Sequence, residues 1–148
     1  MPLQHLDAHA KAIVKLADQI AHDFEQEYVG TEHVLLAILR HNGGLGAQVL
    51  NRLGVTEERA RQAIDQLVQR AKEDTWVIGR LPGSPNYRRV IELAIEEANQ
   101  LQAKLIGSEH LLLALMREKN TTGQRALAQL GVTLSRCRDE IARSRSEQ

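Results

Sequence analysis

The feature that most constrains the fold of this sequence is a tetrapeptide that occurs twice. Residues 30–33 read Gly-Thr-Glu-His and residues 107–110 read Gly-Ser-Glu-His, 77 positions further along the chain. When the chain is aligned with itself at this offset, 12 of the 28 residues in 28–55 are identical to their counterparts in 105–132. The chain therefore consists of two tandem copies of one unit. Two copies are fewer than the roughly three that a solenoid needs, so we expect them to pack on each other as one globule.

Each copy has the hydrophobic periodicity of α-helices. In the first copy, apolar residues recur at three- and four-residue steps through residues 13–24 and again after Gly30. Thr31 and Thr56 are fitting N-cap residues, and Gly54 is a fitting residue to end a helix. The second copy repeats the pattern, with apolar stripes at 90–101, 111–116, 126–130 and 134–141. We predict an all-α fold of about eight helices, in two tandem four-helix repeats with pseudo-two-fold symmetry.

The length of the chain and its turn residues fit a single domain. A chain of 148 residues can bury about 70% of the surface that it exposes when unfolded. We expect one domain at 1–148, with repeat one at about 5–72, a linker at 73–87 and repeat two at about 88–145. Glycine and proline residues punctuate the linker, as is typical of a connecting segment.

Four residues of this linker are more hydrophobic than a solvated loop requires. They are Trp76, Val77, Ile78 and Leu81. One interpretation is that these side chains cover the interface between the repeats as part of the core. The other is that they border an apolar groove that binds unfolded peptides. The sequence leaves both interpretations open.

The charge and hydropathy of the chain argue against two classes of partner. Nineteen basic residues balance nineteen acidic ones, so no electrostatic attraction to nucleic acid is expected. No apolar run approaches the ~20 residues that cross a bilayer, so no membrane association is expected. Cys137 is the only cysteine, and no secretory signal is visible at the N-terminus. We expect a cytoplasmic protein.

The sequence offers no set of residues for catalysis. The phosphate-binding loop of ATPases and the His-Glu-x-x-His zinc motif are both missing from it. Cys137 has no nearby base and orienting group that would make it a nucleophile. We expect His33 and His110 to pack or hydrogen-bond locally at helix starts rather than to bind a metal. The prediction is a protein that is not an enzyme and that needs no cofactor or metal.

The repeated tetrapeptide is the one motif with chemical content. If Thr31 and Ser108 cap their helices, Glu32 and Glu109 lie in the first turn, where free backbone N–H groups point outward. Each glutamate then either complements the helix dipole or forms part of a binding site. Such a site would offer a carboxylate to a guanidinium and backbone donors to an anion. It would suit a ligand that carries both charges close together.

The two motifs and their flanks resemble the N-terminal domain of the Clp ATPases, also called the Clp repeat domain. The segments that carry the resemblance are Tyr-Val-Gly-Thr-Glu-His-Val-Leu-Leu-Ala-Ile-Leu-Arg at 28–40 and Ile-Gly-Ser-Glu-His-Leu-Leu-Leu-Ala-Leu-Met-Arg at 106–117. The resemblance covers the chain from its first helix to about residue 143 and is strongest to the ClpC type. It implies two four-helix repeats in pseudo-two-fold relation, which agrees with the periodicity.

The resemblance also implies a function in recognition. In the family this domain sits on an AAA+ unfoldase ring and receives substrate and adaptor proteins before their delivery to the ClpP protease. In ClpC-type domains the motif glutamates contact the guanidinium of phosphoarginine, a degradation mark. The matching residues here are Glu32 and Glu109, with Thr31 and Ser108 beside them. We therefore expect substrate or adaptor proteins as partners, together with a Clp AAA+ ring in cis or in trans.

The sequence departs from the family pattern in surfaces that family members use for ligands and adaptors. Residues 5–10, His-Leu-Asp-Ala-His-Ala, replace a Thr-Glu-Arg-Ala-like start, and Ser-Pro-Asn at 84–86 replaces Thr-Pro-Arg. The AAA+ modules are missing from the 148 residues. Two interpretations stay open: an excised recognition domain of an unfoldase, or a stand-alone Clp N-domain-like protein that acts as a regulator or adaptor through protein–protein contacts.

Overall fold

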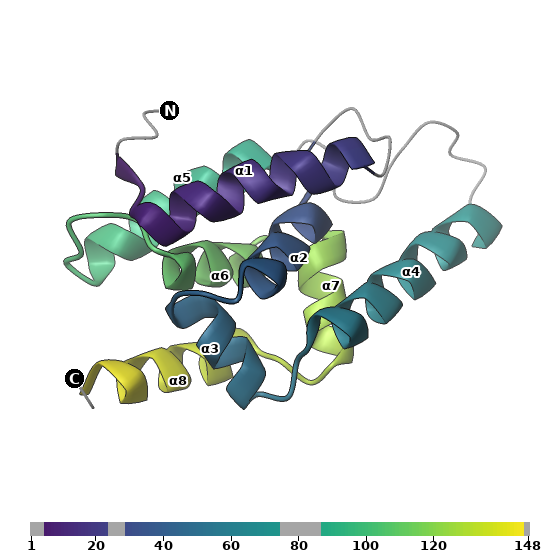
Figure 1. Cartoon of the computed structure of the whole chain (residues 1–148). Coiled ribbons are helices and arrows are strands. Elements are labelled where there is room, and N and C mark those ends of the chain that lie inside the picture. Colours follow the sequence, from purple (N-terminus) through teal and green to yellow (C-terminus); the bar gives the residue numbers. More distant parts are fainter. Residues whose placement is uncertain (1–4, 24–28, 75–86, 147–148) are drawn as a thin grey trace.

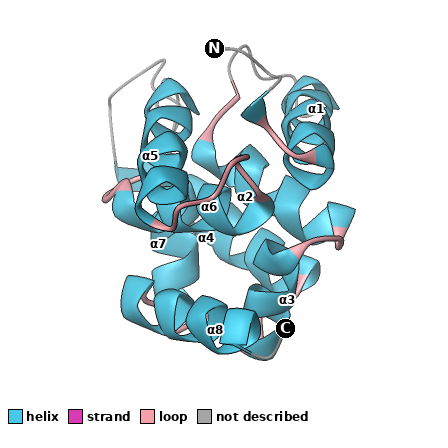
Figure 2. Ribbon diagram, turned by 90° about the vertical axis from the view of Figure 1, so that its left-hand side faces the viewer, coloured by secondary structure: helices cyan, strands magenta, loops and turns pink. Residues whose placement is uncertain are grey.

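The computed structural model describes residues 5–23, 29–74 and 87–146, and this part of the chain consists of helices joined by loops (Figure 2). Its eight helices are α1 (Ala8–Asp23), α2 (Thr31–His41), α3 (Leu45–Arg52), α4 (Glu57–Asp74), α5 (Tyr87–Gln100), α6 (Ser108–Arg117), α7 (Thr122–Gln129) and α8 (Leu134–Ser146). The one β-bridge among the described residues is parallel and joins Leu6, before α1, to Ile106, before α6. The prediction of an all-α fold with about eight helices is confirmed.

The two repeats exchange contacts with each other. Within the repeats, α1 packs on α2 and α5 packs on α6. Between them, α3 packs on α6 and on α8, while α7 packs on α2 and on α4, so each contact has a counterpart with the repeats reversed. Figure 1 shows α1 and α5 on one side of α2 and α6, with α3 and α8 on the other side. This reciprocal packing is the pseudo-two-fold arrangement that the internal repeat predicts.

The helices α2 and α6 lie at the centre of the molecule because they are apolar on nearly every face. Every residue of α2 from Thr31 to Leu39 is buried. In α6, Ser108 and every residue from His110 to Met116 are buried. Both helices are therefore enclosed over most of their length, and Glu109 is only half-buried. The repeated tetrapeptide consequently starts a buried helix in each copy and packs against other elements.

The ends of α3 and α7 show how closely the local sequence fixes the turns. Gly54 and Gly131 have φ values of 84° and 83°, in the left-handed region that favours glycine. The hydroxyl of Thr56 then accepts a hydrogen bond from the N–H of Arg59 (3.2 Å), which confirms its role as the cap of α4. Thr133 does the same for Arg136 at the start of α8 (3.1 Å). The turn after α3 is thus repeated after α7.

The hydrophobic linker residues Trp76, Val77, Ile78 and Leu81 lie outside the described residues. Their two interpretations, as core or as the border of a peptide groove, both stay predictions.

Candidate functional site

The tetrapeptides begin α2 and α6 with glycine as the N-cap. Gly30 and Gly107 have extended backbones, and the helices start one residue later, at Thr31 and Ser108. The expectation that Thr31 and Ser108 are N-caps is therefore wrong. Their hydroxyl groups are engaged elsewhere, and a histidine takes over the capping.

The histidine of each tetrapeptide closes the helix start. His33 Nδ1 accepts a hydrogen bond from the N–H of Gly30 (2.8 Å), and His110 Nδ1 accepts one from Gly107 (2.8 Å). A ring nitrogen that accepts must be unprotonated, so each imidazole is held neutral in this contact. Burial lowers the pKa of His33 to about 4, which keeps the ring neutral at physiological pH. The prediction of a local hydrogen-bonding role for both histidines is confirmed.

The hydroxyl groups of Thr31 and Ser108 join the two repeats. Thr31 Oγ1 accepts a hydrogen bond from the N–H of Gly123 (2.9 Å), and Ser108 Oγ accepts one from Gly46 (2.8 Å). Gly46 and Gly123 lie in the first turns of α3 and α7, and they occupy the same place in the two copies. Each bond therefore crosses from one repeat to the other, and the pair is reciprocal.

These contacts require glycine and leave the hydroxyls inaccessible. A Cβ at residue 123 would lie 2.9 Å from the carbonyl oxygen of Thr31, and one at residue 46 would lie 2.8 Å from that of Ser108. Thr31 is 0% exposed and Ser108 is 1% exposed. The two hydroxyls thus position the helix starts and do not face a ligand. What remains for binding in each tetrapeptide is the glutamate.

Glu32 is a buried acid without a partner for one of its oxygens. Glu32 is only 8% exposed, and its Oε1 has no hydrogen-bond partner in the described part of the chain. Burial raises the pKa of Glu32 to about 7, and the smaller opposing effect is a hydrogen bond with its own backbone. A buried polar atom without a partner is costly, and most buried polar atoms in proteins have one. Glu32 is therefore suited to receive a cation or a hydrogen-bond donor.

Glu109 lies in a different setting, beside a second carboxylate. A Cβ at Gly107 would stand 2.9 Å from Asp7 Oδ2 and nearer still to Glu109 Oε1, so the two acids converge above this glycine. Asp7 also caps α1, since its Oδ1 accepts a hydrogen bond from the N–H of Ala10 (2.8 Å). Glu109 is half-buried and borders an open cavity of about 320 Å³. The other residues that line this cavity are Asp7, His9, Gly44, Leu45, Ala103, Ser108 and His110.

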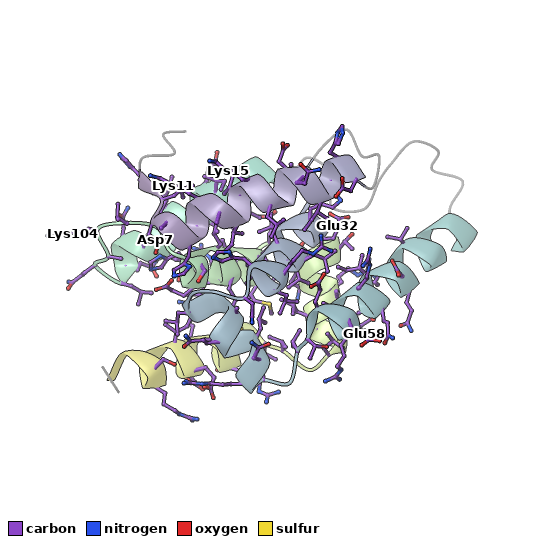
Figure 3. All side chains as sticks on the ribbon, in the orientation of Figure 1. Asp7, Lys11, Lys15, Glu32, Glu58 and Lys104 are labelled. Atoms are coloured by element: carbon purple, nitrogen blue, oxygen red, sulfur yellow. The ribbon has the colours of Figure 1, made fainter. Side chains whose placement is uncertain are left out.

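The sequence indicated Asp7 only as a departure from the family pattern, and the structure makes it part of this cavity. Figure 3 shows Asp7 at the N-terminal end of α1 and Glu32 below the other end of the same helix. The two glutamate-containing helix starts therefore lie apart on the molecule. The bridge between Leu6 and Ile106 brings Asp7 to the second repeat, which no local sequence pattern reveals.

A further buried acid, Glu97 of α5, holds three helices together. It is 0% exposed and accepts hydrogen bonds from Arg138 of α8 (2.8 and 3.0 Å) and from Arg117 of α6 (3.0 Å). Burial by itself would raise the pKa of Glu97, but Arg138 and Arg117 outweigh it and lower the pKa. Its counterpart in the first repeat is Ile20, so the internal repeat gave no signal for this cluster.

Other candidate chemistry is weak in the described residues. Burial raises the pKa of Cys137 to about 11, so its thiol is not activated. Within residues 5–23, 29–74 and 87–146, no group of three or more potential ligands could hold a metal ion. No helix in this part of the chain is both long and apolar enough to span a membrane.

Comparison with known proteins relates this architecture to one family. The family model described as the Clp repeat (R) N-terminal domain matches residues 5–130 and 83–147. The chloroplastic chaperone protein ClpC1 of Arabidopsis thaliana is 36% identical over 131 residues, which cover 88% of this chain and 14% of that protein. The negative regulator of genetic competence ClpC/MecB of Bacillus subtilis (strain 168) is 33% identical over 132 residues, 89% of this chain and 16% of that protein. The chain thus spans about one seventh of the length of these relatives.

Solved structures show the same fold. The N-terminal domain of the chaperone ClpD from Arabidopsis thaliana superposes with a TM-score of 0.70 at 20% identity, and the match covers 98% of this chain and 97% of that one. The Hsp104 N-terminal domain from Candida albicans also has a TM-score of 0.70, at 14% identity, with coverage of 97% and 93%. At these identities the structures support the fold alone.

Proposed function

Since the chain belongs to the family of Clp repeat N-terminal domains, we propose that it is a non-catalytic recognition domain that receives substrate or adaptor proteins for a Clp AAA+ unfoldase–protease system. The AAA+ ring would be its partner, in cis or in trans. The observation that carries the proposal is the pair of acidic helix starts, Glu32 on α2 and Glu109 on α6. Binding at these starts needs no catalytic group.

We further propose that the ligand at each helix start carries a guanidinium, and that phosphoarginine is such a ligand. Glu32 supports this because its buried Oε1 lacks a hydrogen-bond partner among the described residues. Glu109 supports it because Asp7 adds a second carboxylate to the same cavity. A planar guanidinium matches carboxylates with two parallel hydrogen bonds. The backbone N–H groups of the first helical turn would face the phosphoryl oxygens.

The roles of Thr31 and Ser108 change in this proposal. Their buried hydroxyls hold the helix starts against Gly123 and Gly46, so they act as positioning residues and not as contacts to the phosphoryl group. Asp7 adds negative charge to the second site only, which favours the guanidinium there and opposes the phosphoryl group. We therefore expect the site at Glu32 to prefer phosphoarginine over arginine more strongly than the site at Glu109 does.

The experiment that tests this specificity compares three ligands on the unmodified chain. Phosphoarginine, arginine and phosphoserine are titrated while the backbone amides of residues 30–33 and 107–110 are followed by NMR. We expect phosphoarginine to shift the amides of both tetrapeptides, arginine to act mainly at the second, and phosphoserine to act weakly at both. Equal responses to all three ligands, or no response in either tetrapeptide, would contradict the proposed ligand.

A further inference from the structure

The second repeat has a groove at the end of α6 opposite to its glutamate. The groove has a volume of about 520 Å³, and its lining is mainly apolar. It runs between the end of α6, one face of α7 and the start of α8. Its apolar lining residues are Met116, Ala128, Val132 and Leu134, and its polar ones are Arg117, Lys119, Asn120, Gln124 and Thr133. No acidic residue is among the described residues that line it.

The first repeat shows how the equivalent place is filled there. Arg40, at the end of α2, donates from Nε to Glu57 Oε2 (2.9 Å), and its Nη2 lies 2.8 Å from the same oxygen. Glu57 is the first residue of α4. At the offset of 77 residues, Arg117 corresponds to Arg40, but Leu134 corresponds to Glu57. The second repeat thus keeps the arginine but has an apolar side chain in place of Glu57, and the carboxylates that pair with Arg117 come from Glu96 and Glu97 of α5 instead.

The cations at the groove keep free hydrogen-bonding capacity. Arg117 uses Nη1 for Glu97 (3.0 Å) and Nη2 for Glu96 (3.4 Å), while its Nε has no acceptor in the described part of the chain. Nε is the atom that Arg40 directs to its glutamate. Lys119 is exposed and forms no ion pair with any described residue. The neighbouring acid, Glu118, pairs with Arg89 (3.6 Å), so among the described residues the unpaired charge at the groove is that of Lys119.

We propose that this groove docks an aliphatic, acidic segment of a partner protein, whose carboxylate binds Nε of Arg117, the atom through which Arg40 donates to Glu57. Leucine-like side chains of the segment would cover Met116, Val132 and Leu134, and Lys119 would attract the negative charge. The proposal rests on the proposed recognition function only in that the partner is a protein. Its ligand is an anion, whereas the glutamate sites take a cation, so the two can be tested apart.

The test uses three fluorescein-labelled peptides of about ten residues that differ at one position. Each contains Leu-Leu followed by glutamate, glutamine or lysine, in an otherwise polar sequence. Fluorescence anisotropy measures their affinity for the full chain. Because charge-assisted contacts are the stronger ones, we expect the glutamate peptide to bind at least roughly tenfold more tightly than the other two. Equal affinities would overturn the proposal.

The decisive variant is Leu134→Glu, which recreates within the second repeat the pair that Arg40 and Glu57 form in the first. We expect this variant to bind the glutamate peptide roughly tenfold or more weakly than the parent does, while its affinity for phosphoarginine stays unchanged. Ser135→Glu is the matched control, since it adds the same charge at an exposed neighbouring position and should leave peptide binding close to the parent. Melting curves of both variants check that they fold. A third variant, Lys119→Gln, removes the charge of Lys119 and should lower the affinity for the glutamate peptide without changing the apolar residues of the groove.

Two outcomes would overturn the docking proposal outright. One is unchanged binding of the glutamate peptide by a folded Leu134→Glu variant. The other is a dimer of the chain in sedimentation that Leu134→Glu abolishes, since the groove would then be occupied by a second copy. A loss of phosphoarginine binding with intact peptide binding would instead contradict only the function proposed for the glutamates.

Discussion

Glu32 illustrates the conflict between burial and charge at the scale of a single residue. Its burial raises the pKa to about 7 from an ordinary value of 4.5. The folded state therefore holds a proton that the unfolded chain has already released between these two pH values. Since the folded state binds more protons in this window, stability falls as pH rises through it. The full shift corresponds to about 3 kcal/mol, taken at ~1.4 kcal/mol per pKa unit.

We predict that Glu32→Gln removes much of this pH dependence. Glutamine has nearly the same volume as glutamate and is neutral at every pH in this range. The variant therefore has no buried carboxyl group whose ionisation would lower the free energy of unfolding as the pH rises. The melting temperatures of parent and variant are compared between about pH 5 and pH 8, where the parent should lose more stability than the variant. The difference between the two curves isolates the contribution of Glu32, because the two proteins differ at this residue alone. Parallel curves for the two proteins would show that Glu32 is ionised at its ordinary pKa.

At the scale of helices, the starts of α2 and α6 are held by bonds that cross between the repeats. Each helix start contributes a hydroxyl to a glycine N–H of the other repeat, and each glycine has no room for a side chain. The glutamates are the next residues along, so their positions depend on these contacts. The first and second repeats therefore fix each other's candidate sites.

We predict that Thr31→Val destabilises the chain by about 1–3 kcal/mol, because it leaves the buried N–H of Gly123 without an acceptor. Valine keeps the shape of threonine, so the loss is that of the hydrogen bond. Thr56→Val is the matched control, since its hydroxyl caps an exposed helix start and should cost about 1 kcal/mol. Urea denaturation measures both. A loss for Thr31→Val no larger than that of the control would show that the crossing bond contributes little.

The cluster around Glu97 fixes α5, α6 and α8 in the second repeat. We predict that Glu97→Gln destabilises the chain by about 3 kcal/mol, because it breaks a buried acid's pairing with Arg117 and Arg138. The comparison is Glu57→Gln, which breaks the partly exposed pair with Arg40 and should cost at most about 1 kcal/mol. Equal losses in urea denaturation would mean that the burial of Glu97 adds nothing to its pairing.

At the scale of the whole molecule, the duplication was visible in the sequence and gave the helices, the shared core and the turns at Gly54 and Gly131. The helices and turns depend on residues within a few positions of each other, and the shared core follows from the apolar stripes of both copies. Contacts between distant segments could not be predicted from the sequence. Thr31 was predicted to be an N-cap, but its hydroxyl accepts a hydrogen bond from Gly123, 92 residues away, and no local pattern reveals this contact. Asp7 reaches Glu109 through the bridge between Leu6 and Ile106 and the packing of α1 beside α6. Differences between the copies, such as Glu97 for Ile20, also lie beyond what a repeat can predict.

The most direct test of the central claim is a calorimetric titration of phosphoarginine at about pH 8, where Glu32 is largely ionised. The account predicts two ligands per parent chain. Glu32→Gln and Glu109→Gln should each weaken one site by roughly ten- to a hundredfold, and the double variant should bind at neither while remaining folded. Glu58→Gln, an exposed first-turn glutamate of α4, is the control and should bind like the parent. A folded double variant that binds phosphoarginine as tightly as the parent would contradict the account.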